Sequence, residues 1–298
     1  MNMPGKFSEL FFYVILGLLP LQIGVNTSLA AEAGLLTVPE HNISIEFDLQ
    51  SNVLMANSRI ILPAGLSLHL DLSSLNVSQV ILNGQQAEPA PDTTYLDIPA
   101  SQKEQEILIS YRKEIQPGSS PYNMISGAGI TLIDSWFPVA DHDMFFRLTA
   151  GIPLEFEAVS EADEIISLAG SDTKQVTFRF PHPLFSINFI AGPYVVARES
   201  FGEEKTLYSY FFPEDQELAA DYLAKAEKYL ARYEEMLGPY PYARFSIVEN
   251  RLPTGFAMPT FTLLGQSVVR LPFIVDTSLG HEIVHFIHLV YHCNLYLE

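Results

Sequence analysis

The chain has 298 residues, of which 48% are hydrophobic and 17% are charged, a balance typical of folded globular proteins and not of disordered ones. This length is enough for two domains of ordinary size. A formal net charge of −19 repels nucleic acids and anionic membrane surfaces, so neither is expected as a partner. The single cysteine, Cys293, excludes an intrachain disulfide and any zinc site built from several thiolates.

The first thirty residues have the pattern of a signal peptide. Lys6 precedes an apolar run over residues 11–19, which is shorter than a membrane-spanning helix usually needs. The small residues Ser28 and Ala30 suit cleavage before Ala31. We therefore expect residues 1–30 to direct export to the periplasm or the extracellular space. The alternative is an uncleaved membrane anchor, and contact with a membrane is expected only through that segment or through a missing C-terminal part.

Short alternating segments dominate the chain from His41 to about Phe201. Polar and apolar residues alternate as in half-buried strands, and prolines and glycines stand between the segments. The Asn83-Gly84 pair favours a tight hairpin turn. The pattern predicts a β-rich domain over residues 31–212, with strands in the ranges 42–49, 66–72, 80–84, 106–111 and 175–180.

After Pro213 the periodicity becomes helical. Apolar residues recur at helical spacing over residues 218–237, and Gly238-Pro239 ends that helix. A domain boundary is predicted near residue 212, with a second domain over 213–298. Two short strands, 245–248 and 266–271, should follow. The segment 276–278 offers N-caps for a second helix from about Leu279 onward.

The second helix carries a pattern of metal-binding residues. His281 and His285 are four residues apart, so their imidazoles share one helix face and can bind one zinc ion. Glu282 stands beside His281, where a carboxylate can take a proton from zinc-activated water as it attacks a carbonyl. The His-Glu-x-x-His pattern therefore predicts a zinc-dependent hydrolase.

Several segments together resemble the M1 family of zinc aminopeptidases. The segment 233–242 is similar to the opening of that family's catalytic domain, and 254–260 stands where the family has its Gly-Ala-Met-Glu-Asn substrate loop. The segment 279–285 resembles the family's zinc helix, and weaker landmarks of the β-domain lie at 135–138 and 192–196. The resemblance implies an α+β fold, in which a saddle-like, β-rich N-terminal domain precedes the start of a thermolysin-like α/β catalytic domain.

The resemblance also implies roles for individual residues. His281 and His285 would be zinc ligands and Glu282 the general base, while Ala257 and Met258 would line the backbone of a peptide or protein substrate. One departure concerns specificity: Pro259 stands where the family has the loop glutamate that holds the free amine of the substrate. Aminopeptidase specificity is therefore an open question for this chain.

The third zinc ligand of such a site is not found in the sequence. The family's glutamate would follow His285 by about twenty residues, beyond Glu298. His288 and His292 have suitable chemistry but extend the stripe of His285 along one helix, and the residues after His285 do not fit the metzincin pattern. We therefore expect a truncated metallopeptidase with little or no activity. The alternative is a non-catalytic peptide- or protein-binding protein that retains the M1 architecture.

Overall fold

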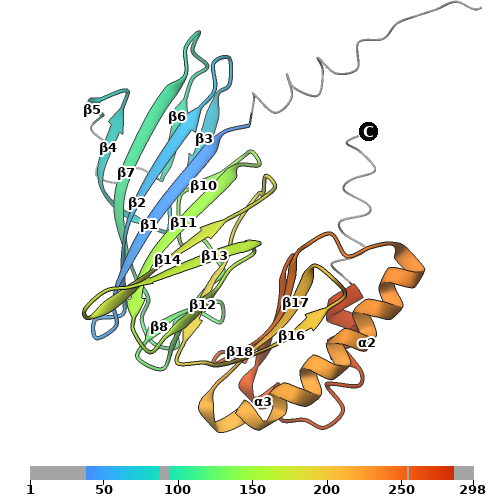
Figure 1. Cartoon of the computed structure of the whole chain (residues 1–298). Coiled ribbons are helices and arrows are strands. Elements are labelled where there is room, and N and C mark those ends of the chain that lie inside the picture. Colours follow the sequence, from blue (N-terminus) through green and yellow to red (C-terminus); the bar gives the residue numbers. More distant parts are fainter. Residues whose placement is uncertain (1–37, 88–93, 254, 285–298) are drawn as a thin grey trace, which may run out of the picture. The chain divides into compact units, whose positions relative to one another are not determined.

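The first part of the chain folds into β-sheet because buried and more exposed residues alternate along its longest strands. In the computed structural model, which describes residues 38–87, 94–253 and 255–284, Ile43 and Ile45 of the first strand lie in the core while Ser44 and Glu46 are exposed. The largest sheet has eight strands, with one parallel pair, β1 and β11 (Figure 1). In spatial order the strands are β13 (Glu164–Ala169), β14 (Thr173–Arg179), β11 (Phe145–Pro153), β1 (Glu40–Asp48), β2 (Val53–Leu62), β7 (Gln105–Glu114), β4 (Asn76–Leu82) and β5 (Gln85–Ala87).

The predicted Asn-Gly turn joins β4 to β5. Asn83 and Gly84 have φ angles of 53° and 77°, the positive values that a two-residue type I′ hairpin requires at both central positions. The prediction from the dipeptide is confirmed.

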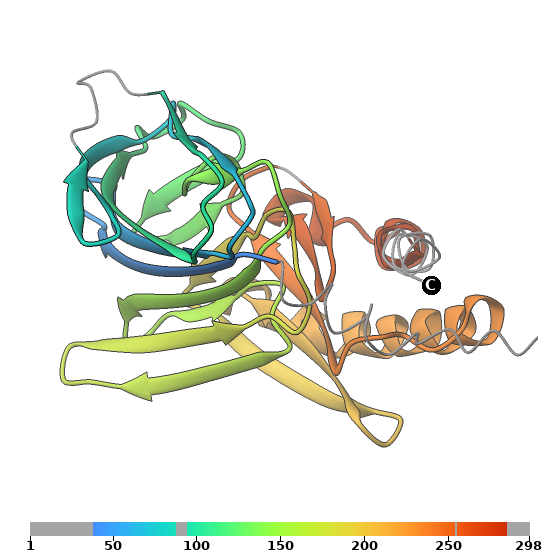
Figure 2. The ribbon, with the colours of Figure 1, turned by 90° about the horizontal axis from the view of Figure 1, so that it is seen from above.

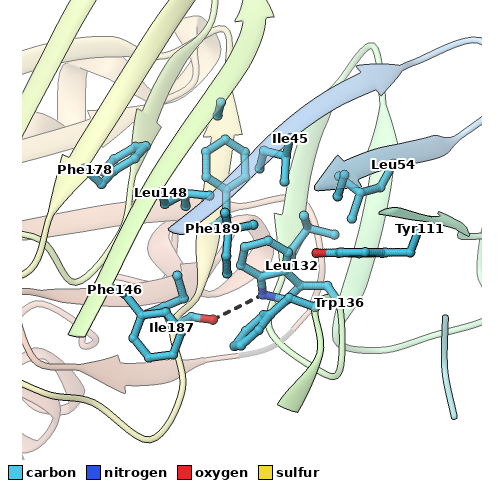
Figure 3. Packing of buried hydrophobic residues seen from close by; sticks show 14 of the residues in the cluster. Ile45, Leu54, Tyr111, Leu132, Trp136, Phe146, Leu148, Phe178, Ile187 and Phe189 are labelled. Carbon is cyan, nitrogen blue, oxygen red and sulfur yellow. Dashed lines mark hydrogen bonds between the residues drawn. The ribbon is translucent and has the colours of Figure 1, made fainter. Parts of the chain in front are cut away.

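Two smaller sheets complete the β-rich part. One has the order β10 (Val139–Ala140), β3 (Leu68–Asp71) and β6 (Tyr95–Ile98), and the other has the order β12 (Glu157–Val159), β15 (Phe189–Gly192), β9 (Gly129–Leu132) and β8 (Asn123–Ser126). Trp136 is fully buried among the apolar side chains of this part, and its indole Nε1 donates a hydrogen bond of 3.1 Å to the carbonyl of Ile187 (Figure 3). The tryptophan that served as a sequence landmark is thus a core residue.

The second part combines one long helix with a mixed sheet. The 3₁₀ helix η1 (Pro213–Leu218) leads into α2 (Ala219–Leu237), which confirms the helix predicted over 218–237. α2 packs against β16 and β17 (Figure 2). Its buried residues include Tyr222, Leu223 and Leu230. The sheet has the order β16 (Val195–Phe201), β17 (Lys205–Phe211), β18 (Arg244–Asn250), β20 (Phe261–Gly265) and β19 (Phe256–Met258).

The strand predicted over 266–271 is wrong. Residues Gln266–Val269 form the short helix α3, which begins directly after β20. The β-branched pair Val268-Val269 favours a strand by propensity, but Val269 is buried in the core beneath the helical turn. Gln266 donates hydrogen bonds to Glu214 and Asp215 through its amide. Packing and side-chain bonds therefore override local propensity here.

The observed architecture confirms the predicted fold class, with a β-rich N-terminal part followed by a smaller part that contains the helices. The boundary near residue 212 stays a prediction. Hydrogen bonds cross it, since Thr131 Oγ1 donates to Asn250 Oδ1 at 2.8 Å and Thr260 Oγ1 to the Ser160 carbonyl at 3.2 Å.

The expected signal peptide, residues 1–30, lies outside the described residues. Across 38–87, 94–253 and 255–284, no helix has the length and apolar character needed to cross a bilayer.

Candidate metal and peptide site

The helix that carries the metal motif begins where the sequence predicts. Residues 278–284 are helical, and the turns before them are closed by local hydrogen bonds. Thr277 Oγ1 donates to the Phe273 carbonyl at 2.7 Å, and the His281 amide donates to the Thr277 carbonyl at 3.3 Å. The 278–284 helix is therefore anchored at its N-terminal end.

Two apolar residues and a glycine fix the face that this helix turns to the core. Leu279 and Ile283, four residues apart, are completely buried in the cluster that also contains the apolar face of α2. Gly280 lies so close to α2 that a Cβ atom there would stand 2.7 Å from Cε1 of Tyr229. The hydroxyl of Tyr233 donates to the Gly280 carbonyl at 2.9 Å.

This packing leaves the two described side chains of the metal motif, His281 and Glu282, outside the buried core. His281 is exposed and Glu282 is half-buried, while Leu279 and Ile283 are completely buried. The second predicted ligand, His285, lies outside the described residues. Within the part of the chain that the structure describes, no three His, Cys, Asp or Glu side chains are grouped so that they could hold a metal ion.

The donor chemistry of the described residues fits one side of a zinc site. An exposed imidazole on a helix, with a carboxylate next to it, is the arrangement that zinc hydrolases use for one ligand and the general base. His281 and Glu282 supply these two groups. The pairing of His281 with His285 stays a prediction.

Part of the predicted substrate loop, Phe256–Met258, forms the edge strand β19. Among the described residues β19 pairs with β20 alone, with Ala257 opposite Thr262 and Met258 opposite Phe261. Ala257 is half-buried at this edge, and Met258 is buried. An edge strand offers main-chain groups to an extended peptide, which can add to the sheet as a further strand. Ala257 is therefore placed on an element suited to the peptide-lining role expected for it.

A buried carboxyl group that the sequence analysis missed supports this loop. Glu161 accepts hydrogen bonds at Oε2 from the Asn188 amide at 2.9 Å and from Ser160 Oγ at 3.0 Å. The Asn188 side-chain amide bonds both to the second oxygen of Glu161 and to the sulfur of Met258, the latter at 3.1 Å. Burial raises the pKa of Glu161 above its ordinary value. No spacing in the sequence connects residues 161, 188 and 258, so only the fold reveals this cluster.

The structure also describes the surroundings of Pro259, which stands where the M1 family has its loop glutamate. Pro259 follows β19, and its carbonyl lies 3.1 Å from the hydroxyl of Tyr240. The next residue, Thr260, is buried and bonded to the Ser160 carbonyl. The loop residues 255–260 carry no charged side chain, so this loop offers no carboxylate to a substrate amine.

Comparison with known proteins identifies the fold. No family model matches the chain, and no curated protein matches it. A solved structure does match, a two-domain M1 zinc metallopeptidase, crystallised as a point mutant bound to L-arginine, with a TM-score of 0.61. The chain has an M1-type fold.

The coverage and the sequence identity of this match decide what it shows about the chain. The match covers 83% of this chain and 63% of the matched protein, at 13% sequence identity. The chain thus spans less than two thirds of this structural neighbour, and at this identity the likeness shows the fold alone. Zinc and L-arginine are properties of the matched protein.

Proposed function

We propose that this M1-type chain is built for zinc-dependent hydrolysis of peptide bonds. The observation that carries the proposal is the packing of the 278–284 helix, which buries Leu279 and Ile283 and leaves His281 exposed with Glu282 beside it. The M1-type architecture supports the same reading, because His281 and Glu282 lie on a helix and the chain also has an edge strand that can receive an extended peptide.

Each residue has a defined task in this proposal. His281 and His285 bind zinc, which when present lowers the pKa of a water molecule toward neutrality and polarises the peptide carbonyl. Glu282 takes the proton of the attacking water and returns it to the leaving amine. Ala257 holds the substrate main chain at the edge of the sheet, while Met258 fixes that edge through Asn188.

Zinc titration of the purified chain tests the metal site. We expect saturable binding that the His281→Ala substitution abolishes, because the substitution removes an imidazole ligand. His182→Ala is the matched control, since His182 is also exposed but lies outside the motif. If the native chain shows no saturable binding, or if both variants bind as it does, the proposed metal site is wrong.

Hydrolysis assays separate catalysis from metal binding. Glu282→Gln should leave zinc affinity within about threefold but lower the turnover of an unblocked peptide by at least about 100-fold, because a glutamine cannot accept the proton. If His281 and His285 are the whole ligand set, two neutral ligands hold zinc weakly, and we expect little turnover even from the native chain.

Pro259 favours a second candidate function, a non-catalytic protein that binds peptides through the retained architecture. The loop then contributes only main-chain groups and the apolar side chains of β19. Zinc-independent binding of an unblocked peptide, unchanged in His281→Ala, would support this candidate and contradict the enzyme. Exported location and a peptide or protein partner are part of both proposals.

A further inference from the structure

Three arginines cross the exposed face of the eight-stranded sheet in a single row. Neighbouring strands place these residues directly opposite one another, while the residues between them along each strand point to the core. All members of the row are exposed or half-buried. From β13 to β2 this arginine row consists of Glu164, Arg179, Arg147, Asn42 and Arg59.

A second row of uncharged polar side chains lies two residues further along the same strands. Ser110 Oγ donates to Asn57 Oδ1 at 2.7 Å, and the hydroxyls of Thr149 and Thr177 lie 3.4 Å apart. From β14 to β4 this hydroxyl-amide row consists of Thr177, Thr149, Ser44, Asn57, Ser110 and Gln79.

Two hollows of about 320 Å³ each lie over these rows. The first is lined by Arg147, Arg179 and Asn42, and the second by Arg59 together with Asn57 and other members of the hydroxyl-amide row. Asn42 lines both hollows, so they adjoin along β1. The face therefore offers polar side chains across several strands, and beyond Arg59 the arginine row continues with the half-buried apolar residues Leu108 and Ile81.

The charges in the arginine row are unevenly compensated. Arg179 pairs with Glu164 at 3.1 Å, and Arg59 pairs with Glu106 at 2.7 Å. Arg147 makes no ion pair within 4 Å among the described residues, although Glu40 lines the same hollow.

Arg147 also stands directly opposite Arg179. Like charges at opposed positions destabilise a sheet. Arg147 has no ion-pair partner among the described residues and stands opposite a second arginine, so a bound anion would relieve the repulsion between the two guanidinium groups.

We propose that this face binds an acidic oligosaccharide, whose sugars carry carboxylates. A guanidinium group binds a carboxylate through two parallel hydrogen bonds, which suits Arg147 and Arg179. The hydroxyl-amide row supplies donors and acceptors for sugar hydroxyls. Adjacent strands are about 4.8 Å apart, close to the length of one pyranose unit, so successive sugars can meet successive strands.

The overall charge of −19 does not prevent such binding. At physiological ionic strength the Debye length is about 8 Å, so charges elsewhere on the chain are largely screened from this face. Direct contacts between a guanidinium and a carboxylate are screened much less. A short oligosaccharide also carries few charges and meets little long-range repulsion.

Calorimetric titration of the full chain with tetragalacturonic acid in about 0.15 M salt tests the proposal. We expect saturable binding that Arg147→Gln weakens by about tenfold or more, because a bidentate contact is lost. Arg147→Lys keeps the positive charge but cannot form two parallel hydrogen bonds with a carboxylate, so it should weaken binding less than Arg147→Gln does. Arg198→Gln is the matched control, an exposed arginine on β16 of the other sheet, and should stay within about twofold of the native chain.

Titrations with other ligands distinguish an acidic oligosaccharide from a neutral oligosaccharide and from an acidic peptide. A neutral tetrasaccharide should not bind measurably, because it lacks carboxylates for the arginine pair. The proposal is overturned if tetragalacturonic acid does not bind, if Arg198→Gln weakens it as much as Arg147→Gln does, or if tetraglutamate binds equally well. The last outcome would assign the face to acidic peptides. Zinc plays no part in these titrations, so their result is independent of the peptidase proposal.

Discussion

At the scale of single residues, the buried carboxyl group of Glu249 and its charged neighbour Asp215 have strongly shifted environments. Glu249 is completely buried on β18; its Oε2 accepts a hydrogen bond of 2.7 Å from the Phe212 amide, and its Oε1 has no partner among the described residues. Burial, together with the nearby Asp215 carboxylate, raises the pKa of Glu249 from 4.5 to about 8. Asp215 itself is held ionised by the guanidinium of Arg270, which lowers its pKa. Glu249 is thus protonated at neutral pH and lies against a charged neighbour.

Stability should therefore fall as the pH rises toward 8. Between pH 4.5 and about 8 the folded chain holds a proton on Glu249 that the unfolded chain has lost, so the stabilisation is complete below pH 4.5 and disappears through this range. Urea unfolding between pH 6.5 and 8 should show the free energy of unfolding decreasing by up to about 1.4 kcal/mol per pH unit from this group.

Substitutions can assign that slope to Glu249. Glu249→Gln should flatten it, whereas Glu235→Gln, at an exposed position of α2, should leave it in place. His41, whose pKa burial lowers from 6.5 to about 3, contributes a slope of opposite sign only below about pH 6.5. A slope that survives Glu249→Gln would show that another group is responsible.

At the scale of elements, the 278–284 helix is positioned by contact with α2. Gly280 permits this contact because any side chain at that position would meet the ring of Tyr229. The hydroxyl of Tyr233, one turn further along α2, bonds to the Gly280 carbonyl. The orientation of the metal-motif residues thus depends on a glycine and two tyrosines outside the His-Glu-x-x-His pattern.

The Gly280→Ala substitution should destabilise the chain, against the ordinary preference of helices for alanine. Alanine normally gains roughly 0.5–1 kcal/mol over glycine inside a helix, but here its Cβ would overlap Tyr229 and cost about 1–3 kcal/mol. Chemical unfolding measures the net loss. Gly127→Ala is the control, because a Cβ there meets nothing within 4 Å. Equal or greater stability of Gly280→Ala would show that the helix does not pack on α2 as described.

At the scale of the whole molecule, three clusters of buried apolar residues form the core, and the chain has a strong excess of acidic residues. The first cluster fills the β-rich part, and the second lies around α2. The third joins Val159 and Ile190 of the β-rich part to Val248 and Met258 of the second part. Met258 of this third cluster also bonds to Asn188, the partner of Glu161. The substrate loop is therefore held in place by residues from both parts of the chain.

Added salt should stabilise the molecule. A chain with a net charge of −19 repels itself, and salt screens that repulsion. We expect the Tm to rise by about 2–6 °C between about 0.02 and 0.3 M NaCl, with KCl giving the same increase. A falling Tm would mean that the ion pairs of the described residues outweigh the general repulsion.

The sequence by itself determined the order and type of the main elements. Alternation in β1 and β7 and helical spacing in α2 reflect the burial of one face of each element, and burial of one face is visible in a single chain segment. The Asn83-Gly84 turn was equally local, because positive φ angles favour these residues. The pattern at 281–285 predicted a metal-binding helix, and the structure confirms the helix up to residue 284.

Only the tertiary structure decided features that join distant residues. Gln266–Val269 became a helix because Gln266 bonds to Glu214 and Asp215 more than fifty residues earlier. The Glu161–Asn188–Met258 cluster and the arginine row arise from strand pairing, which brings together residues with no common spacing. Local periodicity reports which side of an element is buried, whereas pairing and packing between elements place the groups that can bind a ligand.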